Sequence, residues 1–139
     1  MREQPTAVEL IEAVAEFLQR DVQPALSGRL AFHARVAANV LDIVRRELMT
    51  RESVERLEAE RLRSLLGHDG DLESLNDELC DGLASGAVDA NARAVIDHLW
   101  ATTLDTGFVD QPKYGTFRRA LDIIDVSDPG TPAPAFRES

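Results

Sequence analysis

The chain has 139 residues, of which 44% are hydrophobic and 29% charged, and this balance excludes an intrinsically disordered protein. Its net charge of −10, from 25 acidic and 15 basic residues, argues against nucleic acid and anionic membrane surfaces as partners, because both require clustered positive charge. The length fits one domain whose core is built mainly from Leu, Val, Ile and Ala.

The N-terminus and the cysteine content limit location and chemistry. The start MREQPTAVEL lacks the apolar region of a secretory signal peptide. No segment approaches the roughly 18 consecutive apolar residues of a membrane span. Cys80 is the only cysteine, so an intramolecular disulfide and a multi-cysteine metal site are both excluded. We therefore expect a cytoplasmic protein with no membrane segment, no metal and no cofactor.

The first predicted helix runs from about Thr6 to Asp21. Thr6 and Glu9 have the spacing of a capping box, in which each side chain bonds the other residue's backbone. One face of this helix carries Leu10, Val14, Phe17 and Leu18. The pattern breaks at Pro24 and Gly28, which predicts a turn before the next helix.

The second predicted helix is GRLAFHARVAANVLDIVRREL, residues 28–48. Its apolar positions cover roughly half of the helical circumference at about 100° per residue. They are Leu30, Val36, Ala37, Val40, Leu41, Val44 and Leu48. A surface helix usually has a narrower apolar stripe. We therefore predict a central helix that is packed by neighbours on several sides.

Two further helices follow, each with leucines on one side. The segment from Ser53 to Leu66 should face inward with Val54, Leu57, Leu62, Leu65 and Leu66. The next helix should begin with Asp71 as its N-cap, continue to about Ala84 and stop at Gly86. Its seam is formed by Leu72, Leu75, Leu79 and Leu83.

The last two predicted helices lead to the overall fold class. One begins near Asp89 or Asn91 and carries Val95, Ile96, Leu99, Trp100 and Leu104 before Gly107. The other spans Tyr114 to Ile124, with Phe117, Leu121 and Ile124 inward. Strand-like alternation is absent from the sequence. We predict an all-α, single-domain bundle of five to six helices with short loops over residues 1–126, followed by a flexible Pro-rich tail over 127–139.

A polar row on the second helix is the first candidate site. Arg35, Asn39, Asp42 and Arg46 share one side at spacings of four, three and four. One interpretation is a solvated face with a weak Asp42–Arg46 pair. The other is a recognition stripe, in which two arginines grip a carboxylate or phosphate.

His33 is the second candidate, because a histidine among aliphatic residues can be a general base or a ligand. Its nearest polar neighbour on that face is Arg29, one turn earlier. No local acidic residue would fix its tautomer, so the pattern favours a packed core or interface histidine over a catalytic one.

The remaining chemistry-bearing residues give no active site. His68 lies in GHDGD, which lacks the spacing of a calcium loop and predicts a turn followed by an N-cap. His98 has no second histidine at metal-ligand spacing. Cys80 should be a small buried residue at the edge of the leucine seam. Nucleophile, phosphate-loop and dinucleotide motifs are absent.

A helix-to-helix corner, DQPKY at 110–114, is the third candidate. Asp110, Lys113 and Tyr114 cluster there, and tyrosine is favoured at protein interfaces. A structural turn with Tyr114 packed on the bundle is the equal alternative.

Three blocks of the sequence resemble an uncharacterised bacterial family of small helical proteins, known as a domain of unknown function. The blocks are PTAVELIEAVAEFLQRDVQPAL, GRLAFHARVAANVLDIVRREL and DQPKY, which together span most of residues 5–121. The corner is similar to the family's DNPRY-like pattern, with Gln111 in place of Asn and Lys113 in place of Arg. The resemblance implies genes beside aminoglycoside-phosphotransferase-like kinases and acyl-CoA dehydrogenases. It also implies that the small protein supports a kinase that phosphorylates hydroxyacyl-CoA substrates.

Three hypotheses for function follow. The first is a non-catalytic accessory subunit of such a kinase, which binds through the polar row and the corner. The second is a small-molecule binder or enzyme, with Arg29, His33, Arg35 and Asn39 lining a pocket for an acyl-CoA or an acid. The third is a homodimer that uses the broad face of the second helix.

Overall fold

The structure is a computed structural model that describes residues 4–127, with side chains described up to residue 122. Every regular element within these residues is helical, which confirms the predicted all-α class. The tail from residue 128 onward lies outside the described residues. The chain divides into two compact units, residues 1–49 and 50–139, and each is described by itself. The predicted domain range of 1–126 stays a prediction.

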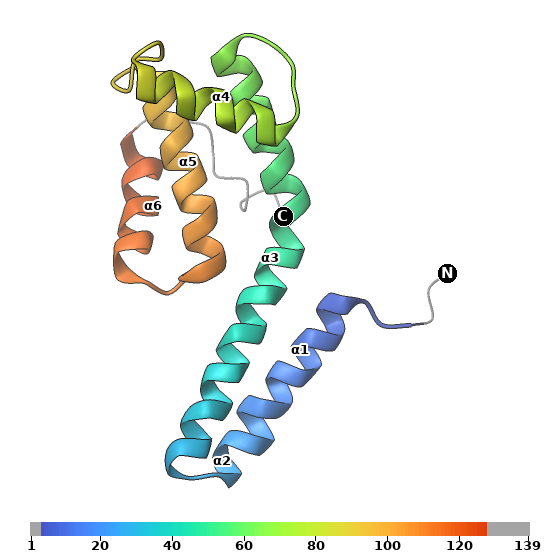
Figure 1. Cartoon of the computed structure of the whole chain (residues 1–139). Coiled ribbons are helices and arrows are strands. Elements are labelled where there is room, and N and C mark those ends of the chain that lie inside the picture. The colour runs from blue at the N-terminus through green and yellow to red at the C-terminus, as the bar shows by residue number, and fades with distance from the viewer. Residues whose placement is uncertain (1–3, 128–139) are drawn as a thin grey trace. The chain divides into compact units, whose positions relative to one another are not determined.

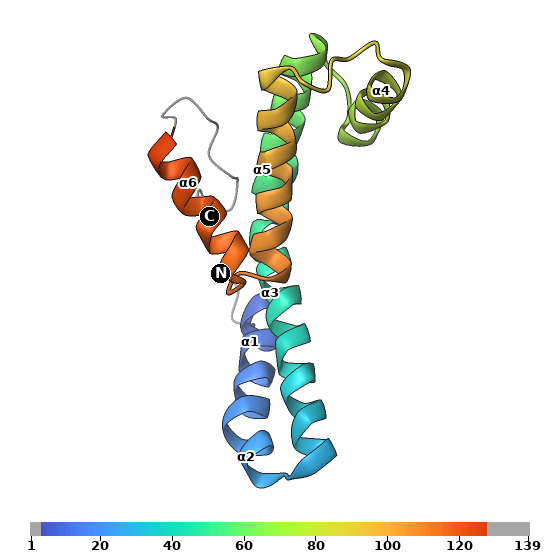
Figure 2. The same cartoon turned by 90° about the vertical axis from the view of Figure 1, so that its left-hand side faces the viewer.

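The first unit is a helical hairpin (Figures 1 and 2). It consists of α1 (Ala7–Phe17), a π-helical segment (Leu18–Val22), the short α2 (Gln23–Ala25) and the first half of α3 (Gly28–Leu66). The predicted capping box begins α1: Glu9 N donates to Thr6 Oγ1 at 3.3 Å, and Thr6 N donates to a Glu9 carboxylate oxygen at 2.7 Å. The chain then reverses, and Gly28 begins α3 in the left-handed region at φ +61°.

Pro24 does not break the first helix where the sequence predicted a break. The π-helical segment directly before it widens the backbone register, and α2 continues through the proline to Ala25. A proline inside an α-helix lacks an N–H and clashes with the carbonyl four residues earlier. The wider turn accommodates this clash, as π-bulges do within helices.

Alanines fill the space between the two helices of the hairpin. Ala15 of α1 and Ala34 and Ala38 of α3 are buried, and Ala38 has no exposed surface. A hydrogen bond from Gln19 Nε2 to Asp42 Oδ2, at 3.3 Å, also joins the two arms. Small side chains let the helices approach closely but bury little apolar area.

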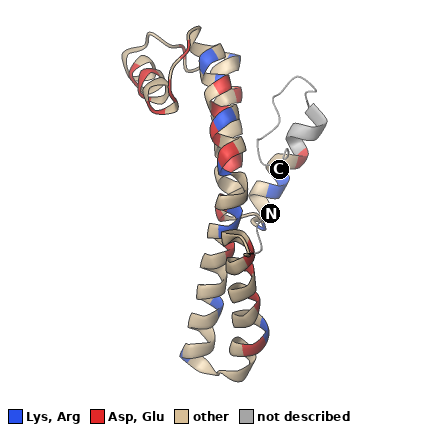
Figure 3. Ribbon diagram, turned by 90° about the vertical axis from the view of Figure 1, so that its right-hand side faces the viewer, with Lys and Arg blue, Asp and Glu red and all other residues tan. Residues whose placement is uncertain are grey.

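The second unit begins on the same helix, because α3 is one helix of 39 residues and not two. The residues between the two predicted helices, 49–52, include neither Gly nor Pro, so nothing ends the helix there. Thr50 is buried, and its carbonyl accepts a hydrogen bond from Ser53 Oγ at 3.1 Å. Figure 3 shows that the second half of α3 alternates acidic and basic residues.

The core of the second unit lies where α4 (Leu72–Ser85) meets the end of α3. Leu62, Leu75 and Leu79 are buried there, with Leu72 and Leu83 packed against them, which confirms the predicted leucine seam. Asp71 is the N-cap of α4, accepting a hydrogen bond from Ser74 N at 2.9 Å, and Gly86 ends the helix at φ +80°. Both signals were correct predictions from sequence.

The unit is completed by α5 (Arg93–Asp110) and α6 (Gly115–Ser127), which run antiparallel about a tight corner (Figure 1). The predicted end of the fifth helix at Gly107 was wrong, since α5 continues to Asp110. Gly107 lies inside the helix, and Phe117 of α6 packs over it, so that an added Cβ would lie 2.8 Å from Phe117 Cδ2. Phe117 is buried, as the sequence predicted.

Candidate functional site

The expected central packing of residues 28–48 is corrected by the exposure of their large side chains. Leu30 is 62% exposed and Val40 is 51% exposed. Apolar side chains do surround much of this part of α3, but α1 packs only against the side that carries the alanines. On α1, three side chains of the predicted apolar face, Leu10, Val14 and Phe17, are likewise exposed. Hydrophobic periodicity located the apolar side chains without revealing what covers them.

These exposed side chains form one surface, which we call the hairpin face. It consists of Leu10, Val14 and Phe17 of α1 and of Leu30, Val36, Val40, Val44 and Leu48 of α3, and Phe32 lies at its far edge, on the side of Asn39. On each helix the centre of this row lies about 120° from the alanine side, in the same rotational sense. For two antiparallel helices, that relation places both rows on the same side of the hairpin.

The predicted pair Arg29 and His33 lies along this face. Arg29 Nε donates a hydrogen bond to His33 Nε2 at 3.1 Å, and both residues are exposed. His33 also contacts Phe32 edge-on, with ring centroids 5.8 Å apart. His33 is therefore a surface histidine among apolar side chains, in the position of an interface residue.

The polar row of α3 is divided between solvent and the hairpin's own contacts. Asp42 is half-buried, accepts the hydrogen bond from Gln19 and lies 3.8 Å from Arg45 Nε. Arg46 is half-buried and has an interaction of its own. Asp42 and Arg46 therefore interact with other residues of the protein as well as with solvent.

Arg35 and Asn39 are the exposed members of the row. The Arg35 guanidinium lies over the Phe32 ring, 5.4 Å from its centroid, which is the distance of a cation–π contact. Both residues lie on a different side of α3 from Arg29 and His33. The four residues named for a small-molecule pocket therefore point in different directions from the helix.

The corner residues border a groove between α5 and α6. It has a volume of about 540 Å³ and is lined by residues that include Trp100, Thr103, Gly107, Asp110, Tyr114 and Phe117. Tyr114 N donates to Gln111 O at 3.1 Å and fixes the corner, while the Tyr114 side chain is 60% exposed. Lys113 is exposed beside it. We call this the corner groove.

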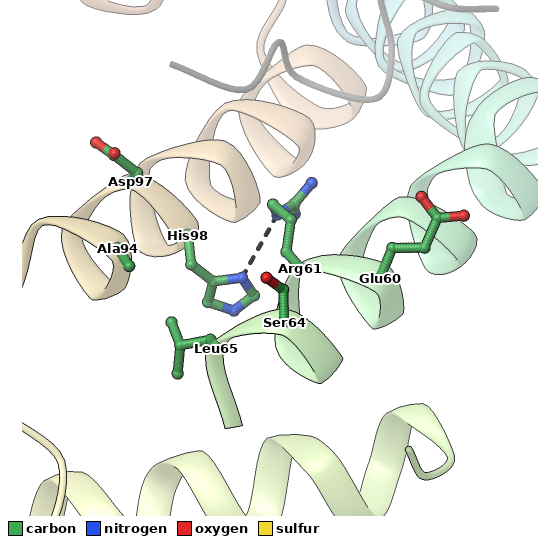
Figure 4. Close-up of a pocket in the computed structure, with 7 residues that line it drawn as sticks. All are labelled: Glu60, Arg61, Ser64, Leu65, Ala94, Asp97 and His98. Atoms are coloured by element: carbon green, nitrogen blue, oxygen red, sulfur yellow. Dashed lines mark hydrogen bonds between the residues drawn. The ribbon is translucent and has the colours of Figure 1, made fainter. Parts of the chain in front are cut away.

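A buried polar cluster on the other side of α5 was not predicted. Arg61 of α3 and His98 of α5 point toward one another, and Arg61 Nε donates to His98 Nδ1 at 3.4 Å (Figure 4). Asp105, also buried, has its carboxylate 3.8 Å from an Arg61 terminal nitrogen. His98 accepts through Nδ1, so its neutral ring carries the proton on Nε2.

Burial sets the electrostatics of this cluster. Desolvation lowers the pKa of His98, and the neighbouring Arg61 lowers it further. Desolvation also lowers the pKa of Arg61, while Asp105 opposes that shift. An adjoining pocket of about 410 Å³ is lined in part by Glu60 and Asp97, whose carboxylates point away from His98 in Figure 4. The arrangement is that of a buried ion pair, Arg61 with Asp105, which joins α3 to α5.

The cluster helps to determine which side of α5 faces inward. Of the apolar residues that the sequence places on this helix, Val95 and Leu104 are buried, but Ile96, Leu99 and Trp100 are exposed. The helix turns His98 and Asp105 inward because Arg61 of α3 hydrogen-bonds His98, 37 residues later in the chain, and its charge offsets that of Asp105. The only sign of this cluster in the sequence was the spacing of His98 and Asp105, which are seven residues apart and therefore lie on the same side of a helix that also carries apolar residues.

Two further predictions concern α4 and the turn before it. Cys80 is exposed, not buried as expected, because the leucine seam fills the α3 contact without it. His68 in the turn bonds Glu78 of α4 through Nε2 at 2.7 Å, and this contact raises its pKa. Among the described residues, no group of three or more His, Cys, Asp or Glu side chains is placed to hold a metal ion.

Comparison with known proteins identifies a family without a known activity. A family model described as "Domain of unknown function (DUF6285)" matches residues 24–114. Neither a curated protein nor a solved structure matches the chain. Within residues 4–127, the helices lack the combination of length and apolarity that crossing a membrane requires.

Proposed function

The chain belongs to DUF6285, a family of unknown function, and we propose that it is a non-catalytic accessory subunit. Its partner is an aminoglycoside-phosphotransferase-like kinase of hydroxyacyl-CoA catabolism, acting in the cytoplasm. The identity of the kinase derives from the resemblance of the sequence blocks. The mode of action derives from the chain's surface, which offers sites for protein contact.

The corner groove is the observation that carries this proposal. Trp100 and Tyr114 line it and are about half exposed, at 49% and 60%. Aromatic residues around a concave apolar site are the usual anchors of protein interfaces. A groove between two helices suits an apolar side chain or a short helix of a partner. Two of the three predicted corner residues, Asp110 and Tyr114, border this groove.

The test is co-expression of the kinase with and without this chain. We expect the chain to raise the soluble yield of the kinase, its turnover of hydroxyacyl-CoA, or both. Trp100→Ala and Tyr114→Ala should each weaken the complex by roughly 30-fold, the effect of losing one hot-spot side chain of about 2 kcal/mol.

The matched control is Leu99→Ala. Leu99 is 44% exposed and neighbours Trp100 on α5 but is absent from the groove lining, so its loss should leave binding within about twofold. Equal solubility and equal turnover of the kinase with and without the chain would refute the accessory function. Equal effects of all three substitutions would refute the corner groove as its docking site.

A further inference from the structure

The hairpin face has the composition of a protein interior but lies on the surface of the first unit. Its nine large apolar side chains are between 37% and 62% exposed, while alanines occupy the contact between the helices. Isolated exposed apolar residues are ordinary, but a set of this size along the two helices of one hairpin indicates a covered surface.

The size of the face matches what a stable dimer needs. Taking roughly 150–200 Å² for each fully exposed large apolar side chain, the exposed fractions amount to roughly 800 Å² per copy. A standard specific interface buries about 800 Å² on each partner. One further protein surface of the same size and apolar character would therefore cover the whole face.

The order of residues on α3 indicates what that surface is. Phe32, Val36, Val40, Val44 and Leu48 are spaced every four residues and form one ridge, which winds about 40° round the helix at each step, so that Val40 lies at its centre and Phe32 and Leu48 at its two ends. The ridge is close to palindromic: on either side of Val40 come a valine and then a bulkier apolar residue. A two-fold symmetric interface needs a surface that is complementary to itself in this way.

We propose that the hairpin face binds a second copy of the chain, so that two hairpins form an antiparallel four-helix bundle. The two-fold axis passes beside Val40, which meets its own symmetry mate. Val36 then packs beside Val44 of the other copy, and Phe32 and Leu48 lie at the edges of the interface. The same register brings His33 level with Glu47 of the other copy, seven residues from the axis, where an imidazole and a carboxylate are complementary partners.

Disulfide trapping tests this register in the full-length chain. In a Cys80→Ser background, Val40→Cys should give a covalent dimer on mild oxidation, because the two-fold axis brings the two Cα atoms within the about 7 Å that a disulfide allows. Asn39→Cys is the matched control: Asn39 is also exposed on α3 but points about 100° away, and this variant should stay reduced. Equal cross-linking at both positions would overturn the proposed register.

Charge exchange at Val40 provides a second test, with mass measured by sedimentation. The unmodified chain should be dimeric at about 10–100 µM, and Val40→Glu and Val40→Lys should each be monomeric with unchanged helix content. Mixing these two variants should restore a dimer, whereas Asn39→Glu should stay dimeric. A monomeric unmodified chain would overturn the proposal and assign the face to another protein or segment.

Failure of mixing to restore the dimer would overturn the two-fold axis at Val40.

The salt dependence of the dimer is a further test, because each copy has a net charge of −10 and repels the other. An apolar interface should persist or strengthen as salt screens this repulsion, so dissociation in high salt would count against the proposal. These experiments use the purified chain alone, so their result is independent of whether a kinase binds the corner groove.

Discussion

Gly107→Ala tests whether α6 is seated closely on α5. In the structure an added Cβ would lie 2.8 Å from Phe117 Cδ2 and 3.3 Å from Cε2. Phe117 is buried, so its ring has little room to withdraw. The methyl group therefore forces α5 and α6 apart or pushes the ring away from its preferred rotamer.

Two opposing effects determine how much Gly107→Ala changes the free energy of unfolding. Replacing Gly by Ala inside a helix normally stabilises it by about 1 kcal/mol. Overpacking of a filled contact costs about 1–3 kcal/mol. We therefore expect Gly107→Ala to lower the free energy of unfolding by up to about 2 kcal/mol, where propensity alone predicts a gain. Urea unfolding followed by far-UV circular dichroism measures this difference.

Gly115→Ala is the matched control. Gly115 is the first residue of α6, and an added Cβ there meets nothing within 4 Å. This substitution should leave stability unchanged or raise it by up to about 1 kcal/mol. Adding Phe117→Leu to Gly107→Ala should cost less than it does in the unmodified chain, because the smaller side chain relieves the clash. The close seating of α6 is refuted if Gly107→Ala and Gly115→Ala stabilise the protein equally.

Three further predictions concern the core, the buried histidine and a helix cap. Leu75→Ala should lower the free energy of unfolding by about 2–5 kcal/mol, measured by urea unfolding, because Leu75 is only 1% exposed between α3 and α4. The lowered pKa of His98 means that, between that pKa and about 6.5, the unfolded chain binds more protons than the folded chain. Stability should therefore fall as the pH drops through this window, and His98→Gln should weaken this dependence; an identical pH profile for both proteins would contradict the assignment. Thr6→Ala should cost about 1 kcal/mol through loss of the capping box, whereas Thr6→Ser should largely retain it.

Local signals gave correct predictions at the helix ends that have a cap. The Thr6–Glu9 capping box, the Asp71 N-cap and the Gly86 stop all involve groups within a few residues of one another. Such contacts are written in the sequence as short spacings. The missed continuity of α3 has the same origin, because the absence of a break at residues 49–52 was itself a local signal.

The inside and outside of each helix were harder to predict because they depend on distant residues. His98 is inward only because Arg61 lies across from it, and no helical spacing on α5 reveals that partner. For the candidate site, the sequence identified Asp110 and Tyr114 at the corner, but the groove they border also needs Trp100, which the sequence analysis named only as an apolar residue of the same helix. The apolar ridge through Val40 was recognised as apolar and misassigned to an intrachain core, since periodicity does not distinguish the two kinds of burial.

The alanine contact of the hairpin has a consequence for how the protein persists in a cell. Ala15, Ala34 and Ala38 contribute little burial, so the first unit has a small interior of its own. Covering its outer side chains would supply much of the missing stability, and folding would then be coupled to association by mass action. We expect the unfolding midpoint to rise with protein concentration. In a monomeric copy the first unit would unfold more often, and the chain would be degraded sooner. The abundance of the chain would therefore depend on how much of it is bound to a second copy.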